Sequence, residues 1–171
     1  MVTPNNKELK MKESDLIVSK TDIKGQITYC NDSFMEFSGI YEEELLDQPH
    51  NIIRHPDMPR AMYRLMWQTL QQENEFFGFI KDLRKNGGFY WNFANVTPSF
   101  DGESKLRGYF AVRRYPMPDG IEFFQTLYQQ MCEVEARIKN EHEAMDASIQ
   151  ILNDAVQDKG GYNEFICSFY R

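Results

Sequence analysis

The chain is poor in cysteine and has no long apolar run. Its three cysteines, Cys30, Cys132 and Cys167, are scattered over 171 residues. They are too few and too far apart for a disulfide framework or a zinc site, which is typical of proteins in a reducing compartment. No window approaches the ~18 apolar residues of a membrane span, and the polar N-terminus lacks the apolar core of a signal peptide. We therefore expect a cytoplasmic protein with no direct membrane insertion.

Positive charge is scarce as well. The chain has 19 Lys and Arg against 26 Asp and Glu, which gives a net charge of −7 at pH 7, and the basic residues do not gather in a patch. This argues against sequence-independent binding of nucleic acid or of an anionic membrane surface. Protein partners are favoured instead.

The local motifs of conventional enzymes are also missing. The sequence has no nucleophile and base at local spacing, no glycine-rich loop to hold a phosphate and no carboxylate pair in its most polar segment. We therefore expect no enzyme activity. The length and the hydrophobic fraction of 42% allow one domain with a substantial core, plus an additional element.

The densest polar segment comprises residues 48–59. It contains three prolines, which restrict the backbone, and the side chains of His50, Arg54, His55 and Asp57. Asp57 is well placed to cap a helix that starts near Met58 and runs to about Gln72.

That helix would carry Trp67 on one apolar stripe with Met62, Tyr63, Met66 and Leu70, at spacings of three and four. A guanidinium and ring nitrogens at one end and an indole on the buried face suit a flat, anionic, aromatic ligand. Each residue alone is as readily explained by core packing. The cluster as a unit indicates a site.

The remaining patterns predict an α+β fold. Residues 16–30 form a hairpin about Gly25, a short helix capped by Asn31 or Asp32 follows, and Tyr41–Leu46 is another brief helix. A second hairpin, residues 76–97, turns at Asn86-Gly87, and residues 105–114 give the last strand. Short helices on one face of an antiparallel sheet are the expected arrangement.

Several motifs together resemble PAS domains of the Aer (aerotaxis-receptor) type. The resemblance covers roughly residues 15–115 and is carried by Asn31-Asp32-Ser33-Phe34, Ser38-Gly39, Gln48-Pro49-His50-Asn51, Arg54-His55-Pro56-Asp57-Met58-Pro59, Met66-Trp67, Lys85-Asn86-Gly87 and Tyr90-Trp91. It implies a five-stranded PAS fold and a redox sensor that binds FAD. It also implies that flavin-binding positions fall on Asn31, His50, Arg54, Asp57 and Trp67, and we add His55 to this site.

Strand alternation extends the predicted site. If Asn92 faces the helices, with Tyr90, Ala94 and Val96, then Phe89, Trp91 and Phe93 face outward and need a cover. Tyr90-Trp91-Asn92 resembles the Phe-Trp-Asn strand of flavin-binding light-sensing PAS domains, which makes Asn92 a candidate flavin contact. In the same frame Arg113 points inward, where a cation favours a reduced, anionic flavin, although a strand-end charge that reaches solvent explains it equally well.

The C-terminal part offers the cover. Residues 1–14 are expected to form an arm, 15–115 the PAS domain, 116–160 a long amphipathic, coiled-coil-like helix and 161–171 an aromatic tail. Heptad spacing of apolar residues runs from Ile121 to Val156, and the helix either continues straight or folds back at its charged middle. The tail docks on the sheet or on a partner.

Three functions remain open. The first is an FAD redox sensor, which is expected to form a homodimer and to signal to a membrane chemoreceptor-type protein. The chain has no membrane segment or methyl-accepting region, and so resembles the stand-alone PAS partner of split energy-taxis receptors. The second is a haem-based gas sensor with His50 or His55 as ligand. The third is a cofactor-free interaction or dimerisation module. Covalent photochemistry is not expected, because residues 51–57 contain no cysteine.

Overall fold

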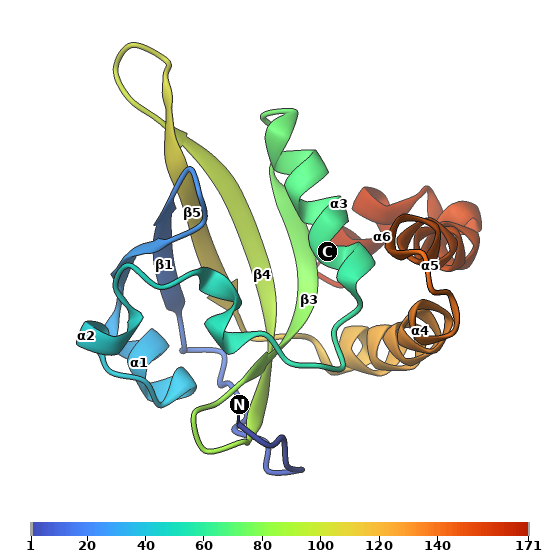
Figure 1. Ribbon diagram of the computed structural model, residues 1–171, viewed down its shortest axis with the longest axis horizontal. Coiled ribbons are helices and arrows are strands. Elements are labelled where there is room, and N and C mark those ends of the chain that lie inside the picture. Colours follow the sequence, from blue (N-terminus) through green and yellow to red (C-terminus); the bar gives the residue numbers. More distant parts are fainter. Residues whose placement is uncertain (1, 171) are drawn as a thin grey trace.

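A five-stranded antiparallel sheet forms the centre of the molecule in the computed structural model, which describes residues 2–170 (Figure 1). Its strands, in the order β2-β1-β5-β4-β3, are β1 (Ile17–Asp22), β2 (Ile27–Cys30), β3 (Phe76–Leu83), β4 (Phe89–Phe100) and β5 (Leu106–Arg114). The predicted α+β fold, with five antiparallel strands, is therefore confirmed.

Helices lie in two groups along the chain. Between β2 and β3 come α1 (Asp32–Ser38), α2 (Glu42–Leu45), the 3-10 turn η1 (His50–Ile53) and α3 (Arg60–Gln71). After β5 come α4 (Pro118–Arg137), α5 (Glu141–Val156), η2 (Gln157–Lys159) and α6 (Tyr162–Ser168). Within residues 2–170, no helix combines the length and the apolar character needed to cross a membrane.

Local turn chemistry explains the first half of the fold. Gly25 has φ of +81° in the β1–β2 turn, a conformation that suits glycine. The Asn31 side chain accepts a hydrogen bond from the Phe34 backbone N–H and so caps α1, and Gly39 ends that helix in the left-handed region. The N-terminal arm then crosses to β4, where Leu9 N–H donates to the carbonyl of Phe89.

The predicted cap of α3 is wrong, although the helix begins at Arg60, close to the expected start near Met58. Asp57 does not cap this helix, because the N-cap is Pro59 and makes no side-chain hydrogen bond. The Asp57 carboxylate instead accepts from the Lys81 ammonium of β3 at 2.6 Å. That partner lies far away in the sequence, so capping preference alone could not reveal it.

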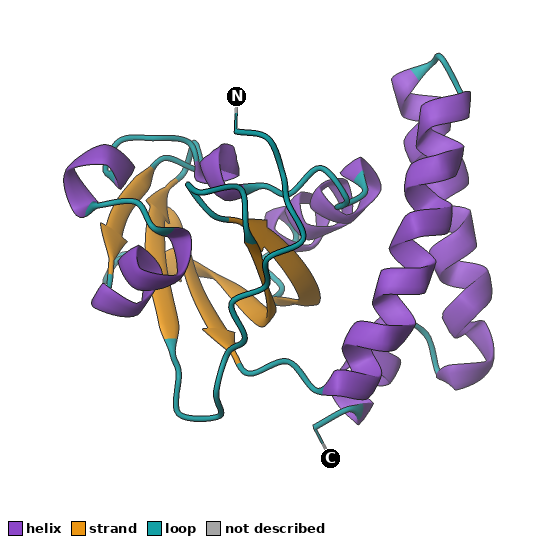
Figure 2. Cartoon of the chain, turned by 90° about the horizontal axis from the view of Figure 1, so that it is seen from below, coloured by secondary structure: helices purple, strands orange, loops and turns teal. Residues whose placement is uncertain are grey.

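The single long helix predicted for residues 116–160 is also wrong, and the fold-back alternative is the one observed. α4 ends at Arg137, and Asn140 caps α5 by accepting from the backbone N–H groups of His142 and Glu143. The two helices lie side by side as a hairpin (Figure 2). A heptad pattern fits both arrangements, because the same apolar stripe is buried in each.

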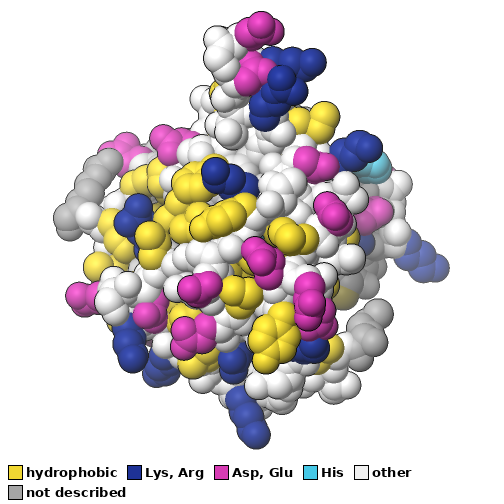
Figure 3. Space-filling view, turned by 90° about the vertical axis from the view of Figure 1, so that its left-hand side faces the viewer, with side chains coloured by type: hydrophobic (Ala, Val, Ile, Leu, Met, Phe, Trp, Pro, Cys, Tyr) yellow, Lys and Arg dark blue, Asp and Glu magenta, His cyan; other side chains and the backbone are white. Residues whose placement is uncertain are grey.

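The helical hairpin and α6 cover the outer face of β3 and β4, as the strand alternation predicts. Trp91 stacks on Tyr128 of α4, whose hydroxyl donates to the Phe79 carbonyl at 3.0 Å. The aromatic tail docks on the sheet rather than projecting away from it, since the rings of Tyr170 and Phe93 lie 4.2 Å apart. On the opposite side of the molecule, apolar side chains gather between charges of both signs (Figure 3).

Candidate functional site

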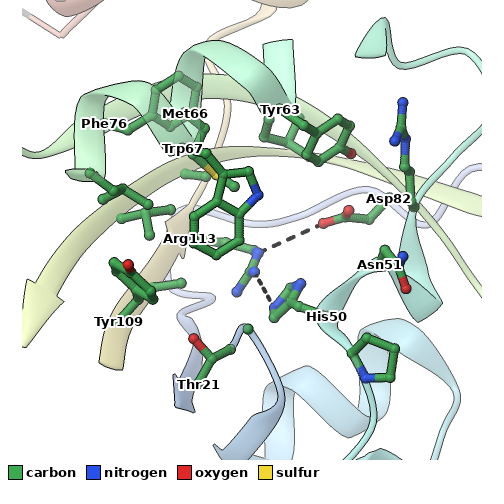
Figure 4. A pocket seen from close by; sticks show the side chains of 18 of the residues that line it. Thr21, His50, Asn51, Tyr63, Met66, Trp67, Phe76, Asp82, Tyr109 and Arg113 are labelled. Carbon is green, nitrogen blue, oxygen red and sulfur yellow. Dashed lines mark hydrogen bonds and ion pairs between the residues drawn. The ribbon is translucent and has the colours of Figure 1, made fainter. Parts of the chain in front are cut away.

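A cavity of about 380 Å³ lies between α3 and the inner face of the sheet. We call it the α3 cavity. Its apolar lining consists of Met66, Trp67, Leu70, Phe76, Ile80, Ala94, Val96, Tyr109 and Ala111. Its polar lining includes Thr21, Lys24, His50, Asn51, Arg54, Tyr63, Asp82 and Arg113 (Figure 4). An apolar pocket with a few polar groups at one end is the usual form of a small-molecule site.

Trp67 forms one wall of the cavity. Its ring meets Tyr109 of β5 edge-on, with centroids 5.2 Å apart. On another side it approaches Gly25, where an added Cβ would lie 3.4 Å from the indole. An added methyl group would make an ordinary van der Waals contact with the ring, so glycine at this position serves the backbone conformation of the β1–β2 turn.

Arg113 dominates the polar end. It is only 5% exposed. Its Nη1 donates to Ser19 Oγ at 3.1 Å, its Nη2 donates to His50 Nε2 at 2.8 Å, and its Nε lies 3.7 Å from the Asp82 carboxylate. Because His50 Nε2 accepts from the guanidinium, the ring proton of neutral His50 resides on Nδ1.

Burial and the guanidinium set the protonation states of the two neighbours of Arg113. Burial, assisted by the Arg113 charge, lowers the pKa of His50 to about 3, so the ring is neutral at neutral pH. Burial raises the pKa of Asp82 to about 6, although Arg113 and the Asn92 amide act in the opposite direction. Arg113 thus faces a neutral imidazole and a carboxylate whose pKa is raised to about 6.

Four of the predicted site residues line the cavity, namely His50, Arg54, Trp67 and Arg113. These residues are far apart in the sequence but lie around one cavity, because η1, α3 and β5 all border it. Arg54 lies over the Tyr63 ring at 4.2 Å and donates to the Met58 carbonyl. The expected alternation on β5 is confirmed, since Tyr109 and Ala111 line the cavity together with Arg113.

The other four predicted residues, Asn31, His55, Asp57 and Asn92, do not line it. The Asn31 side chain forms its hydrogen bonds with the backbone. Its Oδ1 accepts from Phe34 N–H, which caps α1, and from Val18 N–H, and its Nδ2 donates to the Leu16 carbonyl. His55 is buried beside the Phe89 ring, and Asp57 pairs with Lys81.

Asn92 lies directly behind the cavity wall. Its Nδ2 donates to Asp82 Oδ2 at 2.9 Å and to the Ile80 carbonyl at 3.2 Å. Its Oδ1 is buried and has no hydrogen-bond partner in the described part of the chain. The inward register of Asn92 is confirmed, and the side chain positions Asp82.

Sequence reasoning missed Asp82. Its alternation signal was present, because Asp82 pairs with Tyr90 and shares the inward face of β3 with Ile80, which pairs with Asn92. A carboxylate on the otherwise apolar inward face of a strand is the pattern that could have identified it.

Comparison with known proteins fixes the family. The family model described as "PAS fold" matches residues 14–114. The chain belongs to the PAS family. It is 39% identical over 128 residues to the aerotaxis receptor of Escherichia coli K12, a match that covers 75% of this chain and 25% of the receptor. The predicted Aer-type PAS domain is therefore confirmed.

Two further matches extend this similarity. The chain is 28% identical over 158 residues to the nitrogen fixation regulatory protein of Klebsiella pneumoniae, covering 91% of this chain and 31% of that protein. It spans about a third or less of both curated relatives. The PAS fold also matches the structure titled "Flavin Analogue Sheds Light on Light-Oxygen-Voltage Domain Mechanism", with a TM-score of 0.57 and 19% identity, over 67% of this chain and 86% of that one.

Proposed function

We propose that this PAS protein is a redox sensor that binds FAD in the α3 cavity and reports the oxidation state of the flavin to a partner protein. The observation that carries the proposal is the buried guanidinium of Arg113 at the polar end of an apolar, aromatic-walled cavity. The similarity to an aerotaxis receptor supports it.

The residues present fit a flavin ring system. Trp67 and Tyr109 offer aromatic surface, and Arg113 and Asp82 offer a hydrogen-bond donor and an acceptor at the same end. The volume of about 380 Å³ lies near the lower limit of typical ligand pockets, so the cavity suits the ring system rather than a whole dinucleotide. Lys24, Asn51 and Arg54 would then hold the phosphates. The bound flavin would supply reversible electron transfer.

A signal would leave the cavity through α3. This helix carries Trp67 on its cavity side and contacts the helical hairpin on its other side, where Arg64 pairs with Asp146 of α5 at 2.8 Å. A shift of α3 would therefore change its contacts with α5 and, through them, the position of the hairpin. We propose that a membrane chemoreceptor-type protein reads that change, that the sensor acts as a homodimer, and that it works in the cytoplasm without enzymatic activity.

The two alternatives find less support. A haem ligand at His50 would have to displace the Arg113 and Ser19 hydrogen bonds to Nε2, and His55 lies outside the cavity. A cofactor-free module gives no reason for a cavity that ends on a buried ion pair.

An absorbance spectrum of the purified protein tests the proposal. We expect a yellow protein whose flavin bands bleach on reduction with dithionite, and FAD rather than FMN in a heat extract. A Soret band would select haem. A colourless protein that takes up no added flavin would favour the cofactor-free interaction module.

A further inference from the structure

Asp82 is the buried carboxylate of the cavity wall. It is 4% exposed, lines the α3 cavity from β3 and lies between two groups that stabilise its anion. One is the Asn92 amide at 2.9 Å. The other is the Arg113 guanidinium at 3.7 Å, the ion pair marked in Figure 4. In the proposed function this carboxylate serves only as a hydrogen-bond acceptor for the ring system, a role that does not depend on its titration.

We propose that Asp82 balances the charge of the cavity: when electrons enter the bound ring system, Asp82 takes up one proton from water and leaves Arg113 to face the more negative ligand. This inference rests on the proposed function, and it assigns to Asp82 the regulation of the same site.

The geometry supports this role because Arg113 is the cation that both anions would share. The guanidinium is held at Ser19 and His50 by hydrogen bonds, so it cannot swing away from the cavity. Negative charge on the reduced ligand interacts with the Arg113 guanidinium and so weakens the stabilisation that this cation gives to the Asp82 anion. A buried carboxylate that loses this stabilisation becomes protonated.

Other ionisable groups do not replace Asp82. Those that face it or its neighbours are Tyr63 of α3, Tyr90 of β4, His50 of η1, Arg113 of β5, and Arg54, which forms a backbone bridge with Asp82 and whose guanidinium remains charged. Burial raises the pKa of both tyrosines above its usual value, so they stay neutral. His50 beside Arg113 resists protonation, with a pKa lowered to about 3. The pKa of Asp82, raised to about 6, is near enough to neutrality for a modest change in its surroundings to protonate it.

The step balances. Two electrons come from the reductant, which is dithionite in the test. One proton from water joins the ring system, which thereby gains one negative charge, and a second proton from water binds a carboxylate oxygen of Asp82. No bond forms between the protein and the ligand. The Asp82 proton returns to water on reoxidation.

The test measures the flavin midpoint potential between pH 6 and 8 in the wild type and in Asp82→Asn. We expect the midpoint potential of the wild type to fall more steeply with pH than that of the variant. The difference between the two slopes should be about 30 mV per pH unit, which is a tenfold change in the equilibrium constant of a two-electron couple. Asp101→Asn is the control. Asp101 also pairs with an arginine, Arg107 at 2.7 Å, but does not line the cavity. The flavin midpoint potential of the Asp101→Asn variant should therefore follow that of the wild type.

A second measurement needs no variant. In the wild type labelled with ¹³C-aspartate, the infrared difference spectrum between reduced and oxidised protein should show the carbonyl band of a protonated carboxylic acid. Bound flavin with neither this band nor a difference in pH slope would overturn the role of Asp82 and leave the redox sensor intact. A wild type that binds no flavin would overturn both proposals.

Discussion

Glu135 of α4 and Arg60 of α3 join the helical hairpin to the helix that lines the cavity. Glu135 Oε2 accepts from the Arg60 backbone N–H at 2.9 Å, and its Oε1 accepts from Ala61 N–H at 3.0 Å. The Arg60 side chain adds a hydrogen bond to the same carboxylate at 3.2 Å. Pro59 caps α3 without a side-chain bond, so Glu135 supplies the capping acceptor from another helix.

Replacing Glu135 should therefore destabilise the protein. Glu135→Ala leaves two backbone N–H groups of α3 without their acceptor, and we expect the free energy of unfolding to fall by about 3 kcal/mol. Glu141→Ala is the control, because Glu141 pairs with the same arginine from an exposed position and should cost less than about 0.5 kcal/mol. Urea titration of both variants measures the difference. If Glu135→Ala lost as little free energy of unfolding as Glu141→Ala, the capping contact would be energetically unimportant.

Gly120 controls how closely α4 approaches the sheet. A Cβ at this position would overlap the ring of Phe79, which is fully buried. In an exposed helix Gly→Ala stabilises by about 1 kcal/mol, whereas overpacking a rigid core costs about 1–3 kcal/mol. We expect the steric term to win, so that Gly120→Ala lowers the urea midpoint. Gly102→Ala, where a Cβ meets nothing within 4 Å, should leave it unchanged. A stabilised Gly120→Ala protein would mean that Phe79 can move.

The buried histidine should make the fold sensitive to acid. The folded-state pKa of His50 is lowered from 6.5 to about 3, so the unfolded chain binds more protons between these values and stability falls as the pH drops through this range. His50→Gln keeps an acceptor for Arg113 but takes no proton.

Between pH 6.5 and 5 the wild type should therefore lose about 2 kcal/mol more than His50→Gln. Urea titrations at the two pH values measure this. Asp82 contributes in the opposite direction in both proteins, because its pKa is raised to about 6 and its stabilising effect is lost as the pH rises through that value. Parallel losses in both proteins would show that His50 is protonated in the folded state.

Flavin binding should depend on the side chains at the wall and mouth of the α3 cavity. Trp67→Ala and Arg54→Ala remove aromatic surface and a cation, respectively, and we expect each to weaken FAD binding at least tenfold, or by about 1.4 kcal/mol. Tyr41→Ala is the control, since Tyr41 is 70% exposed and does not line the cavity. Fluorescence titration of flavin-free protein gives the affinities. Wild-type affinity in both variants would remove these residues from the site.

Most of the fold could be predicted because its signals are local. The Gly25 and Asn86-Gly87 turns fix the hairpins, and alternation along β4 and β5 fixes which side chains point inward. Alternation places Arg113 in the cavity, whereas His50, Arg54 and Trp67 were found from the dense polar segment and the apolar stripe of the helix that follows it.

What could not be predicted depends on long-range contacts. Asp57 has its partner on β3, so it does not cap the helix that follows it. The break at residues 138–140 leaves the heptad pattern unchanged, and Glu135 fills an apparent core position because α3 needs an acceptor there. The alternation of β3 could point to Asp82, but its pairing with Arg113 of β5 depends on two strands that are far apart in the sequence.

The tyrosine near the end of the chain constrains how the helical hairpin can move. The Tyr170 hydroxyl accepts from Met117 N–H at 3.1 Å and donates to the Tyr115 carbonyl at 2.8 Å, so it bridges the linker between β5 and α4. Swinging the hairpin about that linker would break both bonds. The joint therefore disfavours hinge opening and leaves small shear displacements of the packed helices as the motion that keeps these contacts.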